Sequence, residues 1–333
     1  MNDRSTRATV LITGAGGVAT PSLIQRLQRL GYRVVAADLD PQAVGLYLAD
    51  AAYEVPAGGS PDFPSALIRI CERESVSAVI PLVDEELEAA LALEARGTIV
   101  LLPRLEFVRT CLDKLALMRA LDAAGIGAPA TWLASAPPET PVFPLVAKPR
   151  TGRGSKGLAI LRNQSDLGMM LANNPLPPDR VLLQQYIDGP EFTVSVLTWR
   201  DGEVQAVVPK EIICKRGITR LAVTRRNAAV DAVCRAVQRE LHADGPFNVQ
   251  LRLDRASGKP FIFEINPRFS TTVSLTIAAG VDEVGGLLGQ ALGVLGAAAL
   301  GEWREGVVLV RRTQDEFWTD REFAERAGKI LEA

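Results

Sequence analysis

The segment of residues 10–40 constrains the fold most tightly, because two apolar runs enclose a glycine-rich turn and a helical pattern. The turn has the spacing Gly14-x-Gly16-x-x-Ala19, and the second apolar run ends at Asp38. Strand, turn, helix and strand in this order are typical of a parallel α/β unit. The glycine spacing and the acid that follows also match a dinucleotide-binding fingerprint, in which the acid holds a ribose. An NAD(P)-dependent Rossmann dehydrogenase is therefore a first hypothesis.

The alternation of strand and helix patterns continues and predicts a Rossmann-like domain over residues 1–105. Apolar or alternating runs predict strands at residues 8–13, 33–38, 51–56, 77–82 and 98–103. Helical patterns predict helices at residues 20–30, 63–75 and 84–97, the last of them ended by Gly97.

A different organisation is expected beyond residue 105. Residues 106–139 are mainly helical and end in a proline-rich stretch, which predicts a helical connection. Residues 140–190 predict a small α+β unit. Residues 191–333 contain two hairpin patterns, with turns at Asp201-Gly202 and Ser257-Gly258, and predict a larger antiparallel unit. The predicted fold class is thus α/β in the first part and α+β in the remainder.

Composition narrows the function classes. The chain has 333 residues, a formal net charge of −2 and a single histidine, His242. One histidine argues against His-based metal sites and Ser-His-Asp chemistry, so catalysis must use carboxylates, amides, lysines, arginines or a bound metal. The small net charge gives no reason to expect a nucleic-acid or membrane partner. Four widely spaced cysteines without a CxxC pattern are typical of reduced thiols, so we expect a cytoplasmic protein.

Lys148 lies at the end of an apolar strand pattern, before a loop of residues 150–157 that holds three glycines and three basic residues. Glycines let backbone N–H groups approach phosphate oxygens, and basic side chains neutralise the phosphate charge. The loop therefore predicts a phosphate site, with a solvated basic hairpin as the alternative. Further on, the backbone of the extended residues 184–187 could bind a purine edge. Glu191 could accept hydrogen bonds from ribose hydroxyls, or it could only cap its turn.

The strongest pattern is a hairpin whose two arms carry oxygen-bearing side chains. Alternation places Asn248 and Gln250 on one face of the first arm, and Glu264 and Asn266 on one face of the second. Mg²⁺ prefers oxygen ligands and takes few of them from protein when phosphate and water supply the rest. The pattern thus predicts a metal site, with a structural amide–carboxylate network as the alternative.

Taken in order, Lys148-Pro149, the glycine-rich loop, "QQYIDGPE" and "NVQ…EINPR" resemble the ATP-grasp superfamily. The pattern is most similar to the large chain of carbamoyl-phosphate synthase and its single-module relatives, over roughly residues 8–300. The resemblance implies an ATP-grasp fold. Residues 1–105 would be the Rossmann-like domain, residues 140–190 a small lid subdomain, and residues 191–333 the antiparallel C-terminal ATP-binding subdomain.

The resemblance also implies a role for each matching position. Arg268 and Lys148 are implied as catalytic, and Arg268 would stabilise the transferred phosphate. The implied nucleotide-binding residues are Lys114, Lys148, Gly154, Ser155, Lys156, Gln184, Gln185, Tyr186, Ile187 and Glu191. The implied ligands of Mg²⁺ or Mn²⁺ are Gln250, Glu264 and Asn266.

Two positions depart from the family pattern. Gln184 stands where the family usually has a glutamate near the adenine amino group, although an amide carbonyl can still accept that hydrogen bond. Thr271 stands where the carbamoyl-phosphate enzyme has a further arginine for bicarbonate chemistry. The sequence also contains no glutamine-amidotransferase module and no second synthetase half, which makes bicarbonate a less fitting substrate.

The activity implied by the resemblance is ATP-dependent ligation of a small-molecule carboxylate to an amine or related nucleophile through an acyl-phosphate, with ATP and Mg²⁺ (or Mn²⁺) as cofactors. A homodimer is possible. In this family the first domain binds no dinucleotide, so its glycines would serve a tight turn near the acceptor pocket. The open alternatives are carbamoyl-phosphate-type chemistry, the dehydrogenase and a catalytically silent nucleotide-binding protein.

Three further residues have no settled role from the sequence. Lys210 and Lys215 are candidates for holding the carboxylate substrate or are solvated strand lysines, and solvation is favoured for Lys215. Asp84 could hold an amine, but a favourable interaction with a helix dipole is the preferred interpretation.

Overall fold

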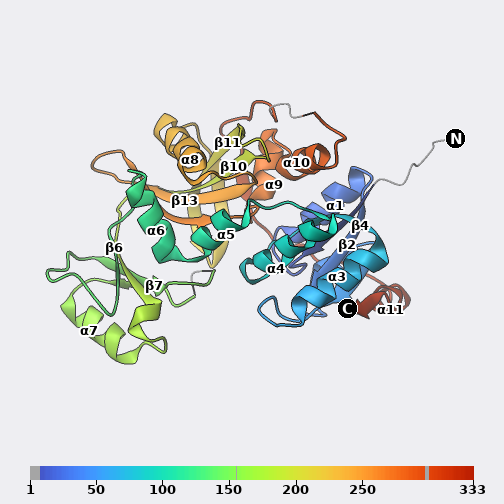
Figure 1. The fold of residues 1–333 in the computed structure, drawn as a ribbon, viewed down its shortest axis with the longest axis horizontal. Helices are drawn as coiled ribbons and strands as arrows, with labels where there is room; N and C mark the ends of the chain where they lie inside the picture. The colour runs from blue at the N-terminus through green and yellow to red at the C-terminus, as the bar shows by residue number, and fades with distance from the viewer. Residues whose placement is uncertain (1–7, 155, 297–299) are drawn as a thin grey trace.

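The computed structural model describes residues 8–154, 156–296 and 300–333, which form three sheets. In Figure 1 the first sheet lies at the right, the small second sheet at the lower left, and the third between and above them. This arrangement confirms the mixed α/β and α+β architecture expected from the sequence.

The first sheet is entirely parallel and forms the core of the N-terminal domain. Its strands are β1 (Thr9–Thr13), β2 (Arg33–Asp38), β3 (Ala51–Glu54), β4 (Val76–Ile80), β5 (Ile99–Val100) and β16 (Ile330–Glu332), in the order β16-β3-β2-β1-β4-β5. Its helices are α1 (Thr20–Arg29), α2 (Val44–Leu48), α3 (Phe63–Glu74), α4 (Leu87–Leu91) and α11 (Asp320–Ala327), with 3₁₀ turns η1 (Asp84–Glu86) and η2 (Ala92–Arg96).

Both faces of this parallel sheet are covered, as a continuous apolar strand sequence requires. Val10 and Ile12 face a core that includes Leu23 of α1, whereas Leu11 faces the opposite core with Phe63 of α3. The first of these cores continues into the third sheet and its helices, so apolar packing joins the N-terminal domain to the rest of the chain.

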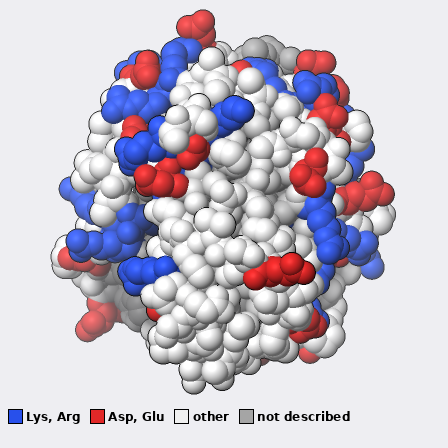
Figure 2. All heavy atoms as spheres, turned by 90° about the vertical axis from the view of Figure 1, so that its left-hand side faces the viewer, with Lys and Arg blue, Asp and Glu red and all other residues white. Residues whose placement is uncertain are grey.

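The second sheet is small and antiparallel. It consists of β6 (Thr131–Leu133), β9 (Val181–Gln185), β7 (Leu145–Pro149) and β8 (Ala159–Leu161), in that spatial order, with helix α7 (Gln164–Asn173) and the 3₁₀ turn η3 (Pro178–Arg180). Figure 2 shows the side of the molecule on which this unit lies. Charged side chains of both signs flank the upper part of that face, and its lower part is largely uncharged.

The third sheet is antiparallel and has the order β14-β13-β10-β11-β12-β15. These strands are β10 (Glu191–Thr198), β11 (Val204–Arg216), β12 (Ile218–Thr224), β13 (Phe247–Leu253), β14 (Pro260–Asn266) and β15 (Val308–Val310). The accompanying helices are α5 (Leu105–Leu112), α6 (Lys114–Ala123), α8 (Ala228–Leu241), α9 (Val273–Ala279) and α10 (Glu283–Ala291). Both predicted hairpins are present, and Gly202 and Gly258 in their turns have positive φ.

The structure differs from the sequence pattern in three places. Residues 84–97 form two 3₁₀ turns around one short helix instead of a continuous helix, although Gly97 ends the segment in a left-handed conformation as expected. Strand β6 belongs to the small sheet although it lies within residues 106–139. Strand β16 pairs with β3 and so returns the end of the chain to the first sheet.

No helix among the described residues is long and apolar enough to span a bilayer.

Candidate active site

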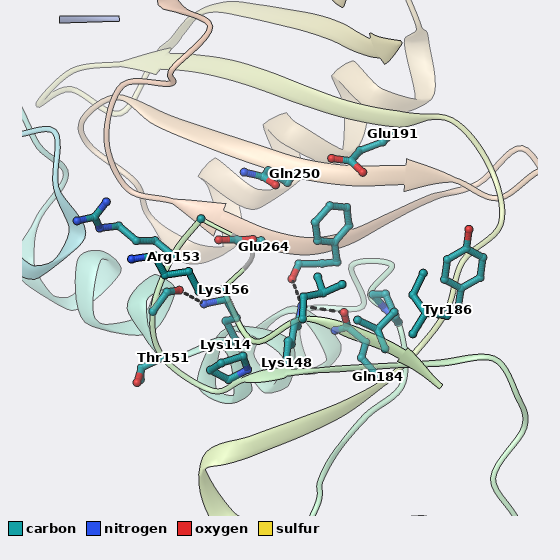
Figure 3. Close-up of a pocket in the computed structure, with 18 of the residues that line it drawn as sticks. Lys114, Lys148, Thr151, Arg153, Lys156, Gln184, Tyr186, Glu191, Gln250 and Glu264 are labelled. Carbon is teal, nitrogen blue, oxygen red and sulfur yellow. Dashed lines mark hydrogen bonds between the residues drawn. The ribbon is translucent and has the colours of Figure 1, made fainter. Parts of the chain in front are cut away.

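A cavity of about 600 Å³ lies between the small sheet and the third sheet. Figure 3 shows Lys148 and Gln184 on one wall and Glu191, Gln250 and Glu264 on the other. The two walls come from units that are far apart in the sequence, so the cavity exists only because the two sheets face each other. Apart from Asn266 and Arg268, every implied site residue that the structure describes lines this cavity. Ser155 lies outside the described residues.

Lys148 lines one wall of the cavity and is only 5% exposed. Its ammonium donates to Gln184 Oε1 at 2.9 Å and to the Phe263 carbonyl oxygen at 3.0 Å. Burial lowers the pKa of this lysine to about 8, although the charge of Glu264 acts in the opposite direction. A desolvated ammonium that has only neutral hydrogen-bond partners is suited to binding an anion such as a phosphate.

Lys114 reaches the same cavity from the first turn of α6. Asp113 caps this helix by accepting from the Leu115 and Ala116 N–H groups, and it also forms an ion pair of 2.6 Å with Arg150. The Asp113 carboxylate therefore fixes the start of the helix and the start of the glycine-rich loop together. Lys114 Nζ donates to the Gly152 carbonyl oxygen at 2.5 Å, within that loop.

The loop itself has the backbone freedom that its sequence suggests. Gly152, Gly154 and Gly157 all have positive φ, between 72° and 108°, which other residues rarely adopt. Arg153 extends from the loop to the N-terminal domain, where its Nε donates to Glu85 at 2.8 Å. This ion pair links the loop to the first domain. It was not anticipated from the sequence, because no local pattern shows that a basic residue of the loop reaches an acid of the first domain.

Residues 184–187 line the cavity, but most of their polar groups already have partners. Gln184 accepts from Lys148, and its amide nitrogen donates to Thr131 Oγ1 at 2.9 Å. The Gln185 and Tyr186 N–H groups donate to the carbonyls of residues 130 and 144. Among the described residues, nothing accepts from the N–H of Ile187, which leaves that group available to a ligand.

Glu191 begins β10 and lies between two cations. Its carboxylate pairs with Lys215 at 3.0 Å and with Arg252 at 3.1 Å. Lys215 lines the cavity and is also exposed to solvent, which agrees with the preferred interpretation of a solvated lysine and adds an ion pair with Glu191. Arg252 was also missed, although it follows Gln250 by two residues on the same strand and so shares its face.

Gln250 and Glu264 are directly paired across β13 and β14, and both are half-buried. No described residue forms a hydrogen bond or ion pair with either side chain. Among the described residues, the side chain of Asn266, two residues beyond Glu264, has only a long hydrogen bond of 3.4 Å, which its Oδ1 accepts from Arg268. These oxygen-bearing side chains fit Mg²⁺ or Mn²⁺, because one carboxylate and two amides leave the remaining octahedral positions for phosphate and water. The described residues contain no cluster of three or more His, Cys, Asp or Glu that could hold a metal by itself.

A second cavity of about 470 Å³ adjoins the first and shares Glu85 and Arg153 with it. Arg268 lines the second cavity, and its Nε donates to Asp84 at 2.6 Å. Asp84 therefore forms a mostly buried ion pair with Arg268. It also lies in the first turn of η1, where a carboxylate can interact with the helix dipole. Thr271 also lines this cavity.

The glycine-rich turn of the first domain lies in the second cavity, together with Asp38. Asp38 does not extend outward as a ribose acid would, because its carboxylate accepts from the Gly16 N–H at 2.7 Å and from the Asp40 N–H at 3.0 Å. The Gly16 amide is one that a dinucleotide pyrophosphate would use. An internal carboxylate at this position disfavours such a ligand and weakens the dehydrogenase hypothesis.

Lys210 is not part of either cavity, which corrects its candidacy as a substrate-binding residue. It is fully buried, and its ammonium donates to Ser195 Oγ at 2.7 Å and to Thr276 Oγ1 at 2.8 Å. The buried Glu283 carboxylate lies close enough to influence its charge. Lys210 is therefore part of a polar cluster in the core.

Two family models match the chain. The family described as "ATP-grasp in the biosynthetic pathway with Ter operon" matches residues 178–315, and the family described as "PylC-like, N-terminal domain" matches residues 10–98. The first match contains the β13–β14 hairpin, and the second contains the glycine-rich turn.

Characterised relatives match parts of longer proteins. The formate-dependent phosphoribosylglycinamide formyltransferase of Rhodococcus jostii is 28% identical over 212 residues, which cover 59% of this chain and 51% of that protein. The arginine-specific carbamoyl phosphate synthase large chain of Bacillus subtilis is 23% identical over 270 residues, which cover 74% of this chain and 25% of that protein. The chain thus spans about half the length of the first relative and a quarter of the second.

Solved structures share the fold over most of the chain. An L-amino acid ligase from Bacillus licheniformis matches with a TM-score of 0.68 and 20% identity, over 86% of this chain and 75% of that one. The ADP complex of N5-carboxyaminoimidazole synthetase from Staphylococcus aureus matches with a TM-score of 0.70 and 18% identity, over 93% and 82%. These likenesses, with the first family model, confirm the fold that the sequence motifs implied.

Proposed function

The chain belongs to the ATP-grasp superfamily, and from this premise we propose that it is an ATP-dependent ligase that joins a carboxylate to an amine or a related nucleophile. The γ-phosphoryl group of ATP passes to a carboxylate oxygen, which gives an acyl-phosphate and ADP. The nucleophile then attacks the acyl carbon, and phosphate leaves. This chemistry depends on positioning and charge neutralisation more than on acid–base side chains, which suits a chain with one histidine.

The observation that carries the proposal is the pair Gln250 and Glu264, which faces Lys148 across one cavity and has no protein partner. Two half-buried oxygen-bearing side chains that no described protein group satisfies are open to a ligand in the cavity. In this proposal they hold Mg²⁺ or Mn²⁺ together with Asn266, and the bound cation offsets phosphate charge.

The nucleotide lies along the remaining lining of the first cavity. The base faces residues 184–187, where the Ile187 N–H remains available, and the ribose lies at Glu191. The phosphates extend toward Lys148 and Lys114, whose ammonium groups now donate only to neutral oxygens and can donate to phosphate instead. The glycine-rich loop, with Gly154 and Lys156, covers the phosphates and excludes water from the acyl-phosphate.

The acceptor substrates occupy the second cavity, which adjoins the first at Glu85 and Arg153. Arg268 lines the second cavity and also contacts Asn266, which lies on the same strand as Glu264 of the first cavity. A guanidinium in this place can neutralise the charge on the transferred phosphate and orient the acyl-phosphate. The names of two relatives support ligation of this kind, because one is an L-amino acid ligase and another is a formyltransferase that depends on formate.

The test is release of ADP across a panel of small carboxylates combined with small amines. We expect the wild-type chain to turn over with at least one combination, and Glu264→Gln to lower that turnover about 100-fold or more, since a bound metal contributes several kcal/mol to the transition state. Glu203→Gln, an exposed residue in a hairpin turn, is the matched control and should leave turnover unchanged. Near-normal turnover by Glu264→Gln with Mg²⁺ would remove the metal assignment.

A further inference from the structure

The charges around the second cavity are unbalanced. Its lining includes three carboxylates and two guanidinium groups. Both arginines already have acidic partners, because Arg153 pairs with Glu85 at 2.8 Å and Arg268 pairs with Asp84 at 2.6 Å. The two lining carboxylates that remain, Asp38 and Glu86, form no ion pair with any described residue. The cavity lining therefore has more carboxylates than guanidinium groups, and no ion pair with a described residue offsets Asp38 or Glu86.

Glu86 is the more unusual of these two carboxylates, because it is only 4% exposed. One of its oxygens accepts from the Thr13 hydroxyl, and the other has no hydrogen-bond partner among the described residues. Gly58 packs so closely that a Cβ there would lie 2.6 Å from Glu86 Cγ, so the side chain has little room to turn away from the cavity.

Asp38 and Glu86 also influence each other. Burial, together with the charges of Asp38 and Glu85, raises the pKa of Glu86 to about 7, while the Thr13 hydrogen bond and the charge of Arg153 act in the opposite direction. A buried carboxylate next to a second carboxylate is stabilised in its charged form when a cation binds beside it. A cavity of about 470 Å³ is far larger than a metal ion and suits an organic molecule.

We propose that the second cavity binds the nucleophilic substrate as a primary ammonium ion, which donates hydrogen bonds to Asp38 and to the unpartnered oxygen of Glu86. This inference rests on the proposed ligase function and gives that function a substrate class. An ammonium has three N–H donors, so it can donate to both carboxylates. An alcohol has only one donor, and an anion would be repelled by the two carboxylates. Binding of an ammonium in this cavity also gives a role to the contact between Asp38 and the Gly16 amide, because that contact holds the carboxylate at the cavity wall.

Glu86 then has a second task in the ligation step. An ammonium nitrogen has no free electron pair, so Glu86 must first take one of its protons. The nitrogen pair attacks the acyl carbon, the C–N bond forms, and the C–O bond to phosphate breaks with its electron pair on phosphate. The second proton leaves the nitrogen and passes to phosphate, which departs as hydrogen phosphate, and Glu86 releases its proton to solvent.

One experiment separates this inference from the proposed function by trapping the acyl-phosphate. Hydroxylamine is uncharged at pH 8 and reacts with acyl-phosphates to give hydroxamates, so it needs no ammonium site. With a carboxylate panel and Mg-ATP, Asp38→Asn and Glu86→Gln should form hydroxamate within about twofold of wild type. Amide formation from primary amines should fall at least tenfold in both variants. Glu88→Gln removes a charge from the same segment but pairs with Arg109 at the surface, and it should behave as wild type in both assays.

A binding measurement tests the inference even without turnover. Saturation-transfer NMR compares each primary amine of the panel with the alcohol in which a hydroxyl replaces the amino group. We expect a signal for at least one amine over its alcohol, and loss of that signal in the Asp38→Asn/Glu86→Gln double variant. Equal signals for amines and alcohols, or amide formation that both variants retain, would overturn the inference. Absence of hydroxamate in the wild type would instead refute the ligase proposal.

Discussion

Replacing Glu86 by glutamine should stabilise the protein at alkaline pH and not at acidic pH. Glutamine has the same shape and can still accept from the Thr13 hydroxyl, so the packing around Gly58 is preserved. The change removes only the titration. Because burial raises the pKa of Glu86 to about 7, the folded protein holds this proton more tightly than the unfolded chain, in which the carboxyl titrates at its usual 4.5. The stability from this proton is fully present below pH 4.5 and is lost as the pH rises through 7.

The magnitude follows from the two pKa values. Each unit between them corresponds to about 1.4 kcal/mol of unfolding free energy. Most of this energy is lost between pH 5 and pH 8.5, which gives about 2.5 kcal/mol over that interval. Glutamine does not titrate and loses none of it. At about 2 °C per kcal/mol for a chain of this size, Glu86→Gln should gain about 5 °C in Tm over wild type between pH 5 and pH 8.5.

The assay is thermal unfolding of both proteins at the two pH values, without ligand, followed by circular dichroism. Other groups that titrate in this range are common to both proteins and cancel in the comparison. Glu88→Gln serves as the control, because that carboxylate is at the surface and its replacement should not change the pH dependence. If the Tm difference between Glu86→Gln and wild type is the same at pH 5 and pH 8.5, burial does not perturb Glu86 in the way argued from the structure.

Three further predictions test other parts of the structure. Arg268→Ala should lower kcat by at least about tenfold and change ATP affinity little in titration calorimetry, and a larger loss of affinity than of kcat would contradict a transition-state role. Lys210→Met should lower the free energy of unfolding by about 3 kcal/mol, because it removes the positive charge that offsets the buried Glu283 carboxylate. Lys210→Met/Glu283→Leu should recover most of this loss in denaturant unfolding. Gly189→Ala should cost about 3 kcal/mol or more, because its φ is 153° and a Cβ would lie 1.7 Å from the last carbonyl oxygen of β13. Gly168→Ala in α7, where a Cβ meets nothing within 4 Å, should instead raise Tm, and equal effects would refute the steric argument.

The sequence predicts most of the fold because its local patterns agree with its tertiary arrangement. The strands of the first sheet are apolar on both faces, and both hairpins have glycine at the turn, so periodicity is sufficient to find them. Strands β6 and β16 have only three residues each, and their pairing depends on partners far away in the chain. Neither strand lies in a longer apolar run such as residues 98–103, which contains the short strand β5, so the sequence alone could not assign them.

The candidate site is predictable to the extent that it consists of sequential motifs. Gln250 and Glu264 could be paired in advance because strand alternation fixes which side chains share a face. The positions of Lys210 and Lys215 could not be predicted in this way, since both lysines belong to one strand. Only the neighbouring elements decide that Lys210 is buried and that Lys215 lies at the cavity. Asp38 was recognised as an acid at a strand end, but its turn toward Gly16 depends on a side-chain conformation that a motif does not encode.

Strand β16 has a consequence for the synthesis of the protein. The sheet that starts with β1 is completed only by residues 330–332, which pair with the outer edge of β3. While the ribosome makes the intervening residues, that edge has unpaired backbone groups that can pair with other chains. The first domain therefore cannot finish folding until residue 332 has emerged, although its other five strands are available by residue 100. We therefore expect nascent chains to aggregate less when residues 330–332 are synthesised sooner after the first five strands of this sheet.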